Sequence, residues 1–337
     1  MSAPLRATVV GAGAWGTALA KVLCDVGHEV RIWSYEPEVA QSINERSTNP
    51  YLKGITLPAG LRADADLGRA VGGAELVVSV SPSQVVRNVM SEAAPHLRAD
   101  ATIVSASKGV ELGTLLRMDE VLATVLSPSV MERFSVLSGP SFAHEVAAGA
   151  PTAVVVASRE QAVAESVQAA FQTRVFRVYT NLDVIGVELG GALKNVIALA
   201  AGMTAGLGFA HNTTAALITR GLAEITRLGV ALGARQATFY GLAGMGDLVL
   251  TCTGSASRNR TVGFRLGQGE TLDAILGDMT AVAEGVKTAS AVHELARRHG
   301  VEMPIAEQVY AIVEKGRSPL EALQALMERD PKPEEWS

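Results

Sequence analysis

The chain has 337 residues, of which 48% are hydrophobic, and this length and composition suffice for two domains with apolar cores. The formal net charge of −5 comes without a basic block, which argues against nucleic acid as a partner. Two distant cysteines, Cys24 and Cys252, lack metal-ligand spacing, so we expect neither a disulfide framework nor a zinc site. Residues 1–6 lead straight into an expected strand and leave no room for a signal peptide, which predicts a cytoplasmic protein.

The first elements of the chain are a strand, a glycine-rich turn, a helix and a second strand. Residues 7–10 are typical of a short strand, residues 17–23 have helical periodicity, and residues 29–33 again favour a strand. The turn between the first strand and the helix is Gly-Ala-Gly-Ala-Trp-Gly, at positions 11–16. A G-x-G-x-x-G match within this order of elements indicates a dinucleotide-binding turn.

Each glycine of this turn has a physical role in such a site. Gly11 allows the tight turn, Gly13 lets the backbone approach a pyrophosphate, and Gly16 permits close packing of the helix on the strand. The helix N-terminus offers N–H groups and a positive dipole to the phosphates. We therefore predict a dinucleotide site, the alternative being a glycine-rich turn without a ligand.

The end of the second strand bears on which nucleotide binds. An acidic residue at that position would bind the ribose 2′-hydroxyl of NAD. Here the strand ends in Ser34 and Tyr35, and Glu36 comes two places late. Ser34 would not repel a 2′-phosphate, although no arginine follows at once to bind one. We predict NADPH as the cofactor, with NADH as the alternative.

Further strands follow in the first half of the chain. They are expected at residues 75–80, 101–106, 134–137, 152–157 and 174–178. Ligands of an open parallel sheet gather beyond the carboxyl ends of its strands. Lys108 follows one of these strands and is placed to meet an anionic substrate, unless it is an ordinary loop lysine. His144 opens the next helix, and we expect a capping or solvated histidine rather than a base.

After Asp183 the sequence favours helices, the first of them started by Asn181 and Asp183, and another capped at Asn212 and Thr213. We predict an α/β N-terminal domain that is Rossmann-like, with a mostly parallel doubly wound sheet, followed by an all-α C-terminal domain. The expected ranges are 1–182 for the dinucleotide-binding domain, 183–330 for the all-helical substrate domain, and 331–337 for a frayed tail.

An almost uncharged stretch, residues 189–210, carries a single lysine, Lys194, followed by Asn195. Burial disfavours the ammonium and would lower its pKa, which lets a lysine exchange protons near neutral pH. The alternatives are a lysine that extends to the surface or one that pairs with Glu188. The stretch is long enough to span a membrane, but its lysine, asparagine and many glycines favour a buried helix that breaks near residues 202–208.

Two later segments carry polar groups in unusual places. Asp247 lies between a glycine and an apolar run, where it would pair with a cation such as Lys194 or bond Thr251. Residues 257–259, Ser-Arg-Asn, precede a helical pattern, and a hydroxyl, a guanidinium and an amide at a helix start suit an oxyanion. The alternative is a capped surface turn with solvated arginines.

Six motifs of this sequence, taken together, are much more specific for one family than any of them alone. They are, in chain order, residues 11–16 (Gly-Ala-Gly-Ala-Trp-Gly), 107–109 (Ser-Lys-Gly), 138–143 (Ser-Gly-Pro-Ser-Phe-Ala), 191–195 (Gly-Ala-Leu-Lys-Asn), 246–248 (Gly-Asp-Leu) and 257–260 (Ser-Arg-Asn-Arg). The chain closely resembles the NAD(P)-dependent sn-glycerol-3-phosphate dehydrogenase family in its bacterial biosynthetic form, and the resemblance covers nearly the whole chain.

The resemblance implies a role for each matching position. Lys194 would donate and accept the proton, and Asp247 would orient it. The positions around the substrate would be Lys108, Gly139, Ser141, Asn195, Asp247, Thr251, Ser257, Arg258 and Asn259. The positions that contact the cofactor would be Gly11, Gly13, Ala14, Trp15, Gly16, Ser34, Tyr35, Lys108, Ala143, Arg258, Val282 and Glu284. Related chains often place a basic residue where Ser34 and Tyr35 stand, which leaves the choice between NADP and NAD open.

The family implies the reversible, NAD(P)-dependent reduction of dihydroxyacetone phosphate to sn-glycerol 3-phosphate, without a metal, which supplies the glycerophospholipid backbone. The partner would be this small phosphate ester, with no membrane insertion. Glycine- and alanine-rich helices of the second half would pack against a twin chain in a homodimer. One alternative is a related dehydrogenase acting on a hydroxy acid or a 2-oxo acid. Another is a nucleotide-sensing protein without turnover.

Overall fold

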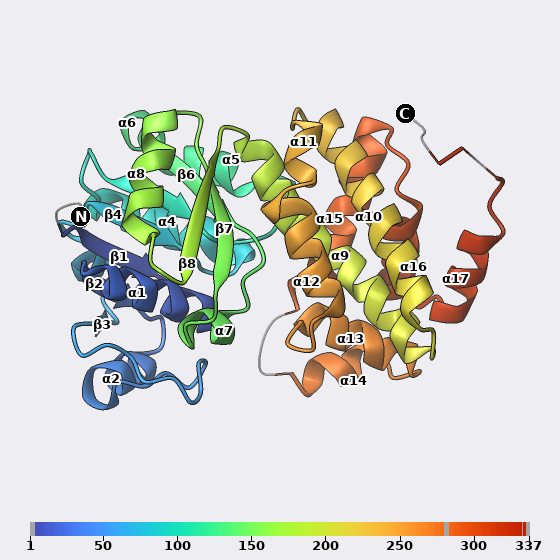
Figure 1. Ribbon diagram of the computed structural model, residues 1–337, viewed down its shortest axis with the longest axis horizontal. Helices are drawn as coiled ribbons and strands as arrows, with labels where there is room; N and C mark the ends of the chain where they lie inside the picture. Colours follow the sequence, from blue (N-terminus) through green and yellow to red (C-terminus); the bar gives the residue numbers. More distant parts are fainter. Residues whose placement is uncertain (1–3, 280–282, 332, 335–337) are drawn as a thin grey trace. The chain divides into compact units, whose positions relative to one another are not determined.

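The short apolar runs of the first half form one eight-stranded sheet in the order β3-β2-β1-β4-β5-β6-β7-β8 (Figure 1). The computed structural model describes residues 4–279, 283–331 and 333–334. The strands are β1 (Arg6–Val10), β2 (Glu29–Trp33), β3 (Arg62–Asp64), β4 (Leu76–Ser79), β5 (Thr102–Ser105), β6 (Phe134–Ser138), β7 (Thr152–Ala157) and β8 (Phe176–Asn181). Neighbouring strands are parallel except β6 and β7, which are antiparallel. The predicted mostly parallel, Rossmann-like sheet is confirmed.

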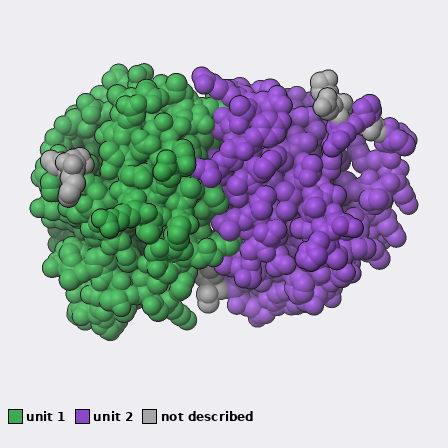
Figure 2. All heavy atoms as spheres, in the orientation of Figure 1, with its two compact units in different colours: residues 1–111, 116–187 green, residues 112–115, 188–337 purple. Residues whose placement is uncertain are grey.

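Two compact units make up the chain, residues 1–111 with 116–187 and residues 112–115 with 188–337 (Figure 2). The helices of the first unit are α1 (Ala14–Val26), α2 (Pro37–Arg46), α3 (Leu67–Val71), α4 (Val86–Ala93), α5 (Met118–Ala123), α6 (Pro128–Met131), α7 (Ala143–Ala147) and α8 (Gln161–Phe171), with short 3₁₀ turns η1 (Ser83–Val85) and η2 (Ala94–His96). Helices α1, α7 and α8 pack together on the sheet, and α3, α4, α5 and α6 form a second connected layer.

Two details of the sheet differ from the sequence prediction. The edge strand β3 was not predicted, because three residues at positions 62–64 carry no period-two pattern. Strand β8 begins at Phe176 and not at residue 174, and its side chains alternate between buried and exposed. The other strands lie within a residue or two of their expected bounds.

In the described part of residues 188–337 every regular element is helical, which confirms the predicted all-α C-terminal domain. The elements are α9 (Val184–Gly206), α10 (His211–Ala231), α11 (Gln236–Phe239), the π-turn η3 (Leu242–Gly246), α12 (Asp247–Thr253), α13 (Arg258–Gly267), α14 (Leu272–Gly277), α15 (Glu284–His299), α16 (Pro304–Lys315) and α17 (Pro319–Met327). Helix α10 begins at His211, so Asn212 and Thr213 lie inside its first turn and do not cap it, contrary to expectation.

Helix α9 is the apolar stretch that carries Lys194. The Asp183 carboxylate caps it by accepting a hydrogen bond of 2.9 Å from the Gly186 N–H. It ends at Gly206, within the stretch where we expected a break. It is long and apolar enough to cross a membrane, yet 94% of its most apolar window is buried inside the protein, as in the core helix of a folded domain.

Glycines let α9 and α13 pack backbone against backbone. Gly202 and Gly206 of α9 face α13, and Gly263 and Gly267 of α13 face α9. A Cβ atom on Gly263 would lie 2.0 Å from the Leu199 carbonyl oxygen, well inside contact distance. These glycines therefore pack two helices of the same chain against each other, whereas we expected glycine-rich helices of the second half to pack against a second copy of the chain.

We predict that Gly263→Ala lowers the free energy of unfolding by about 2 kcal/mol or more, because the added methyl group must push α13 off α9. Urea denaturation followed by circular dichroism measures this loss. Gly277→Ala is the matched control, since a Cβ atom on Gly277 at the end of α14 meets nothing within 4 Å. Equal unfolding midpoints for the two variants would contradict the close packing of α9 on α13.

Candidate active site

Lys194 lies in the middle of α9 and is buried, with 6% of its surface exposed. Its Nζ atom donates to Asp247 Oδ1 at 2.5 Å and to Thr251 Oγ1 at 2.8 Å. Asp247 is 1% exposed, so both charges of this pair are withdrawn from water. Of the alternatives raised by the sequence, a lysine that extends to the surface is therefore excluded.

The chain around Asp247 folds so that its carboxylate reaches α9. Asp247 and Thr251 are one turn apart on α12, and the Thr251 hydroxyl donates to the Asp247 carbonyl at 2.6 Å. The π-turn η3 precedes α12, and a Cβ atom on Gly190 of α9 would lie 2.5 Å from the Ala243 carbonyl oxygen of that turn. Glycine at position 190 thus permits the close approach of η3 to α9, one turn before Lys194.

The electrostatics of the pair are those of two opposite charges that stabilise each other in an apolar interior. Burial removes both charges from water, and their mutual contact compensates for that loss. The sequence analysis raised pairing with Asp247 as one alternative, and the structure shows this pair. An ammonium has three N–H donors, and the contacts with Asp247 and Thr251 fix the direction in which Lys194 points them.

The neighbouring cysteine is a buried thiol. Cys252 follows Thr251 and is buried, and burial raises the pKa of its thiol to about 12, although the nearby Lys194 acts in the opposite direction. A thiol with that pKa remains protonated at neutral pH and is a poor nucleophile. Cys24 is a second free thiol, distant in sequence and half-buried.

The segment from Ser257 to Asn259 forms the start of α13. Ser257 is the N-cap, and its Oγ accepts a hydrogen bond of 3.2 Å from the Arg260 N–H. Arg258, the first helical residue, is exposed. Asn259 is buried and accepts a hydrogen bond of 2.9 Å from the Gly285 N–H at the start of α15. The geometry therefore combines a capped turn with an exposed guanidinium at a helix N-terminus, where an anion is favoured.

The remaining predicted residues of the second unit lie around the same helices. Asn195 is buried on α9, and a Cβ atom on Gly285 would lie 2.6 Å from the Asn195 carbonyl oxygen. Glu284 is the first residue of α15 and is half-buried. Val282 lies outside the described residues.

The glycine turn after β1 has the geometry that a dinucleotide-binding turn requires. Gly11 has a φ of +129°, a conformation that side chains other than glycine rarely adopt. A Cβ atom on Gly16 would lie 1.9 Å from the Gly11 carbonyl oxygen, whereas one on Gly13 would meet nothing within 4 Å. The turn is thus tight on its inner side and open at Gly13, the N-cap of α1.

Trp15 belongs to this turn, and the residues after β2 follow the strand that pairs with β1. Trp15 is half-buried in the first turn of α1, and its buried Nε1 has no hydrogen-bond partner among the described residues. Ser34 is buried, and its hydroxyl donates to the Glu36 carbonyl at 2.9 Å. Tyr35 is 84% exposed. The Glu36 carboxylate accepts a hydrogen bond of 2.5 Å from the Tyr51 hydroxyl, and this contact raises the pKa of Tyr51.

Three predicted substrate residues of the first unit lie together beyond β5 and β6. Lys108 Nζ donates to the Gly139 carbonyl at 3.2 Å, and the Ser141 hydroxyl donates to the same carbonyl at 3.1 Å. Ala143, half-buried, begins α7, and the exposed His144 has its Nε2 3.2 Å from the Lys53 carbonyl oxygen. Because β1, β4, β5 and β6 are parallel, the segments after them share one edge of the sheet with the glycine turn.

No group of three or more histidine, cysteine, aspartate or glutamate side chains within the described ranges is arranged to hold a metal ion. Charged and polar groups instead form two sets, one in each unit. The first comprises the glycine turn with Lys108, Gly139 and Ser141. The second comprises Lys194 with its two partners and the start of α13. The first set suits a phosphorylated nucleotide and an anion, and the second suits proton transfer.

Comparison with known proteins identifies the class. Residues 6–164 match the family model of the NAD-dependent glycerol-3-phosphate dehydrogenase N-terminus, and residues 183–324 match that of its C-terminus. The chain therefore belongs to the NAD-dependent glycerol-3-phosphate dehydrogenase family.

Individual relatives match over almost their full length. The glycerol-3-phosphate dehydrogenase [NAD(P)+] of Geobacter sulfurreducens is 56% identical over 98% of this chain and 99% of its own. The crystal structure of glycerol-3-phosphate dehydrogenase from Coxiella burnetii is 40% identical, with a TM-score of 0.92 over 97% of this chain and 99% of that one. The solved structure of Plasmodium falciparum glycerol-3-phosphate dehydrogenase, 23% identical, has a TM-score of 0.88 over 98% of this chain and 97% of that one, which shows the same fold.

We predict that Asp247→Leu lowers the free energy of unfolding by about 3–5 kcal/mol, because it removes the carboxylate that lies 2.5 Å from the buried Lys194 ammonium. Lys194→Met combined with Asp247→Leu should recover most of that loss, since an apolar pair of similar size needs no compensation. Urea denaturation of both variants measures the difference. If the single variant were as stable as the wild type, the pair would not be held as the geometry indicates.

Proposed function

We propose that this protein catalyses the reversible NAD(P)-dependent reduction of dihydroxyacetone phosphate to sn-glycerol 3-phosphate, which supplies the glycerophospholipid backbone. Membership of the family supports the reaction, as do the names of relatives that are more than half identical. The single observation that carries the assignment within the chain is the buried Lys194 held by Asp247 and Thr251.

The proposed chemistry assigns the proton to Lys194. Reduction of a ketone places negative charge on the carbonyl oxygen, and the Lys194 ammonium donates a proton to that atom. In the reverse direction the neutral amine takes the proton from the hydroxyl. Asp247 and Thr251 fix the direction of the amine, and the Asp247 carboxylate stabilises the charged form. Because the ammonium supplies the proton, the reaction needs no metal.

Substrate binding is proposed at residues that suit a phosphate ester. Arg258 offers a forked guanidinium for the phosphate, beside the N-terminus of α13. The other proposed contacts are Lys108, Gly139, Ser141, Asn195, Thr251, Ser257 and Asn259. Binding of the phosphate holds the substrate carbonyl in its reactive orientation before the chemical step begins.

The nicotinamide cofactor, when bound, supplies the hydride. The open turn at Gly13 and the unpartnered Trp15 Nε1 fit a nucleotide, and we propose that residues 11–16, Ser34, Tyr35, Lys108, Ala143, Arg258, Val282 and Glu284 hold it. We further propose a preference for NADPH over NADH. Position 34 carries no carboxylate, and the Glu36 carboxylate is bonded to Tyr51, so neither is committed to a ribose 2′-hydroxyl.

The domain ranges 1–182 and 183–330, with a tail at 331–337, are proposed as the functional division of the chain. We propose a cytoplasmic protein without membrane insertion, because α9 is buried within the fold. We also propose a homodimer, and the exposed Phe209, Leu320 and Met327 are candidate interface residues, since the glycine faces are occupied internally. Sedimentation equilibrium would distinguish a dimer from a monomer.

The reaction is tested by initial rates with dihydroxyacetone phosphate, followed by the absorbance of the reduced nicotinamide. The protein is first treated with a chelator, so that activity does not depend on a bound metal ion. We expect kcat/KM for dihydroxyacetone phosphate to exceed that for 2-oxo acids by at least about 10²-fold, because the site is built for a phosphate. We expect NADPH to have a lower KM than NADH. Preference for a carboxylate substrate would favour the related dehydrogenases, and absence of turnover with every ketone would favour a nucleotide sensor.

A further inference from the structure

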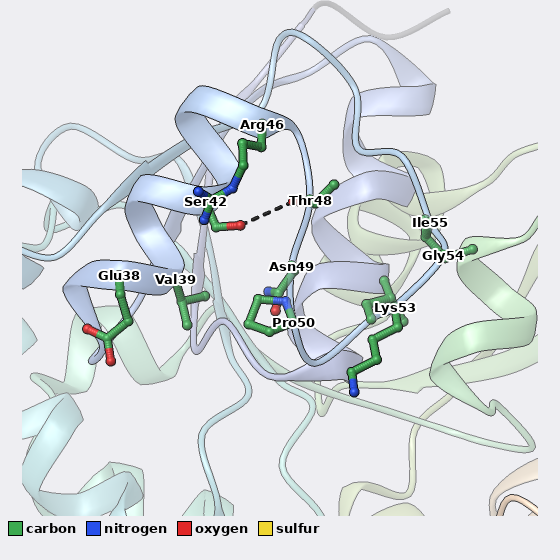
Figure 3. Close-up of a pocket in the computed structure, with 11 residues that line it drawn as sticks. Glu38, Val39, Ser42, Arg46, Thr48, Asn49, Pro50, Lys53, Gly54 and Ile55 are labelled. Carbon is green, nitrogen blue, oxygen red and sulfur yellow. Dashed lines mark hydrogen bonds between the residues drawn. The ribbon is translucent and has the colours of Figure 1, made fainter.

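A loop that the sequence did not single out lies against the glycine turn. It follows α2, and the Leu57 N–H closes its base by donating to the Ser47 carbonyl at 2.8 Å. Figure 3 shows this loop passing beside α2, with a hydrogen bond between Ser42 and Thr48. A hollow of about 390 Å³ lies between the two, and no predicted site residue lines it.

Asn49 ties this loop to the turn that follows β1. Its side chain is 2% exposed, and its Nδ2 donates to the Ala12 carbonyl at 2.9 Å and to Thr17 Oγ1 at 2.8 Å. Its Oδ1 accepts a hydrogen bond of 2.8 Å from the Tyr51 N–H. The amide of Asn49 therefore acts both as donor and as acceptor, and its two N–H groups donate to the glycine turn and to α1.

The contact with Ala12 sets the direction of one peptide group. Ala12 lies between Gly11 and Gly13, and its carbonyl belongs to the same planar unit as the Gly13 N–H. In a trans peptide the C=O and N–H point to opposite sides. Holding the Ala12 carbonyl toward the loop therefore turns the Gly13 N–H away from it, on the open side of the turn. Gly13 is the residue at which a Cβ atom would meet nothing within 4 Å.

The same asparagine also places Tyr51. The bond between Asn49 Oδ1 and the Tyr51 N–H makes a local turn of the kind that asparagine favours. Tyr51 in turn donates its hydroxyl to the Glu36 carboxylate, just beyond the end of β2. Asn49 thus connects the turn that suits a pyrophosphate with the strand end at which a nucleoside is recognised.

We infer that Asn49 is a positioning residue for the dinucleotide, which acts through the Ala12–Gly13 peptide and through Tyr51 without touching the reacting atoms. The inference rests on the proposed use of NADPH. Removing the amide should weaken cofactor binding, because the turn is no longer held in its binding conformation. It should leave kcat and the KM for dihydroxyacetone phosphate close to those of the wild type.

Two variants separate the two functions of the amide. Asn49→Ala removes all three hydrogen bonds. Asn49→Ser keeps a hydroxyl that can accept from the Tyr51 N–H but is too short to reach Ala12, so it preserves the loop while releasing the turn. We expect Asn49→Ala to raise the Kd for NADPH about tenfold and Asn49→Ser to raise it by a smaller factor, because the serine keeps the bond to Tyr51; titration of the folded protein measures both. Circular dichroism establishes that each variant is folded.

The chain offers a control on α2, the helix that precedes this loop. Asn44 on α2 donates to the Ala63 carbonyl and accepts from the Ala63 N–H, both at 2.9 Å, so these two bonds go to β3 and not to the glycine turn. Asn44→Ala therefore removes a comparable pair of bonds. We expect it to lower the melting temperature while the Kd for NADPH stays within twofold of the wild type.

The outcomes distinguish this inference from the proposed reaction. If the Asn49 variants bind NADPH as the wild type does, or if Asn44→Ala weakens binding equally, the inference is wrong. A wild type that binds neither NADPH nor NADH would also overturn it. If NADPH binding depends on Asn49 but dihydroxyacetone phosphate is not reduced, the reaction is wrong and the inference stands.

Discussion

The second unit of this protein depends on one buried contact, the ion pair between Lys194 and Asp247. A lone ammonium would be costly in the interior of α9, and a lone carboxylate equally so at the start of α12. Each is tolerated because the other is 2.5 Å away and Thr251 adds a hydrogen bond. Gly190 brings η3 close to α9, and the facing glycines of α9 and α13 hold the neighbouring helix in contact. The small residues around Lys194 thus serve to bring backbones close enough for a polar pair to form.

The first unit places its polar groups by a different device, the shared edge of a parallel sheet. The segments after β1, β5 and β6 converge there because these strands run in the same direction. The backbone conformation sets the geometry of this edge, since Gly11 and Gly139 both have positive φ. Lys108 and Ser141 both donate to the Gly139 carbonyl. The Asn49 side chain also binds this turn, by donating to the Ala12 carbonyl and to the Thr17 hydroxyl. Rigid backbone and few side chains suit the recognition of phosphate groups.

Much of this was predictable from the sequence, and the exceptions have physical reasons. The glycine turn, most strands and the apolar helix around Lys194 follow from local patterns, and the pairing with Asp247 was one of two alternatives raised. The edge strand β3 was missed because three residues carry no periodicity. The packing of α9 on α13 through facing glycines was not predicted, because sequence does not tell which surface a small residue meets. Asn49 precedes a proline and is typical of a turn, and its contacts span more than thirty positions, so no local pattern revealed it.

The central claim is that the buried Lys194 amine performs the proton transfer and has no part in holding the cofactor. Its most direct test is Lys194→Ala, with kcat for dihydroxyacetone phosphate reduction and the Kd for NADPH measured on the same preparation. The account predicts a loss in kcat of about 10²-fold or more, as for removal of a general acid, with the Kd for NADPH within twofold of the wild type. A parallel loss of NADPH binding, or a kcat close to that of the wild type, would contradict it.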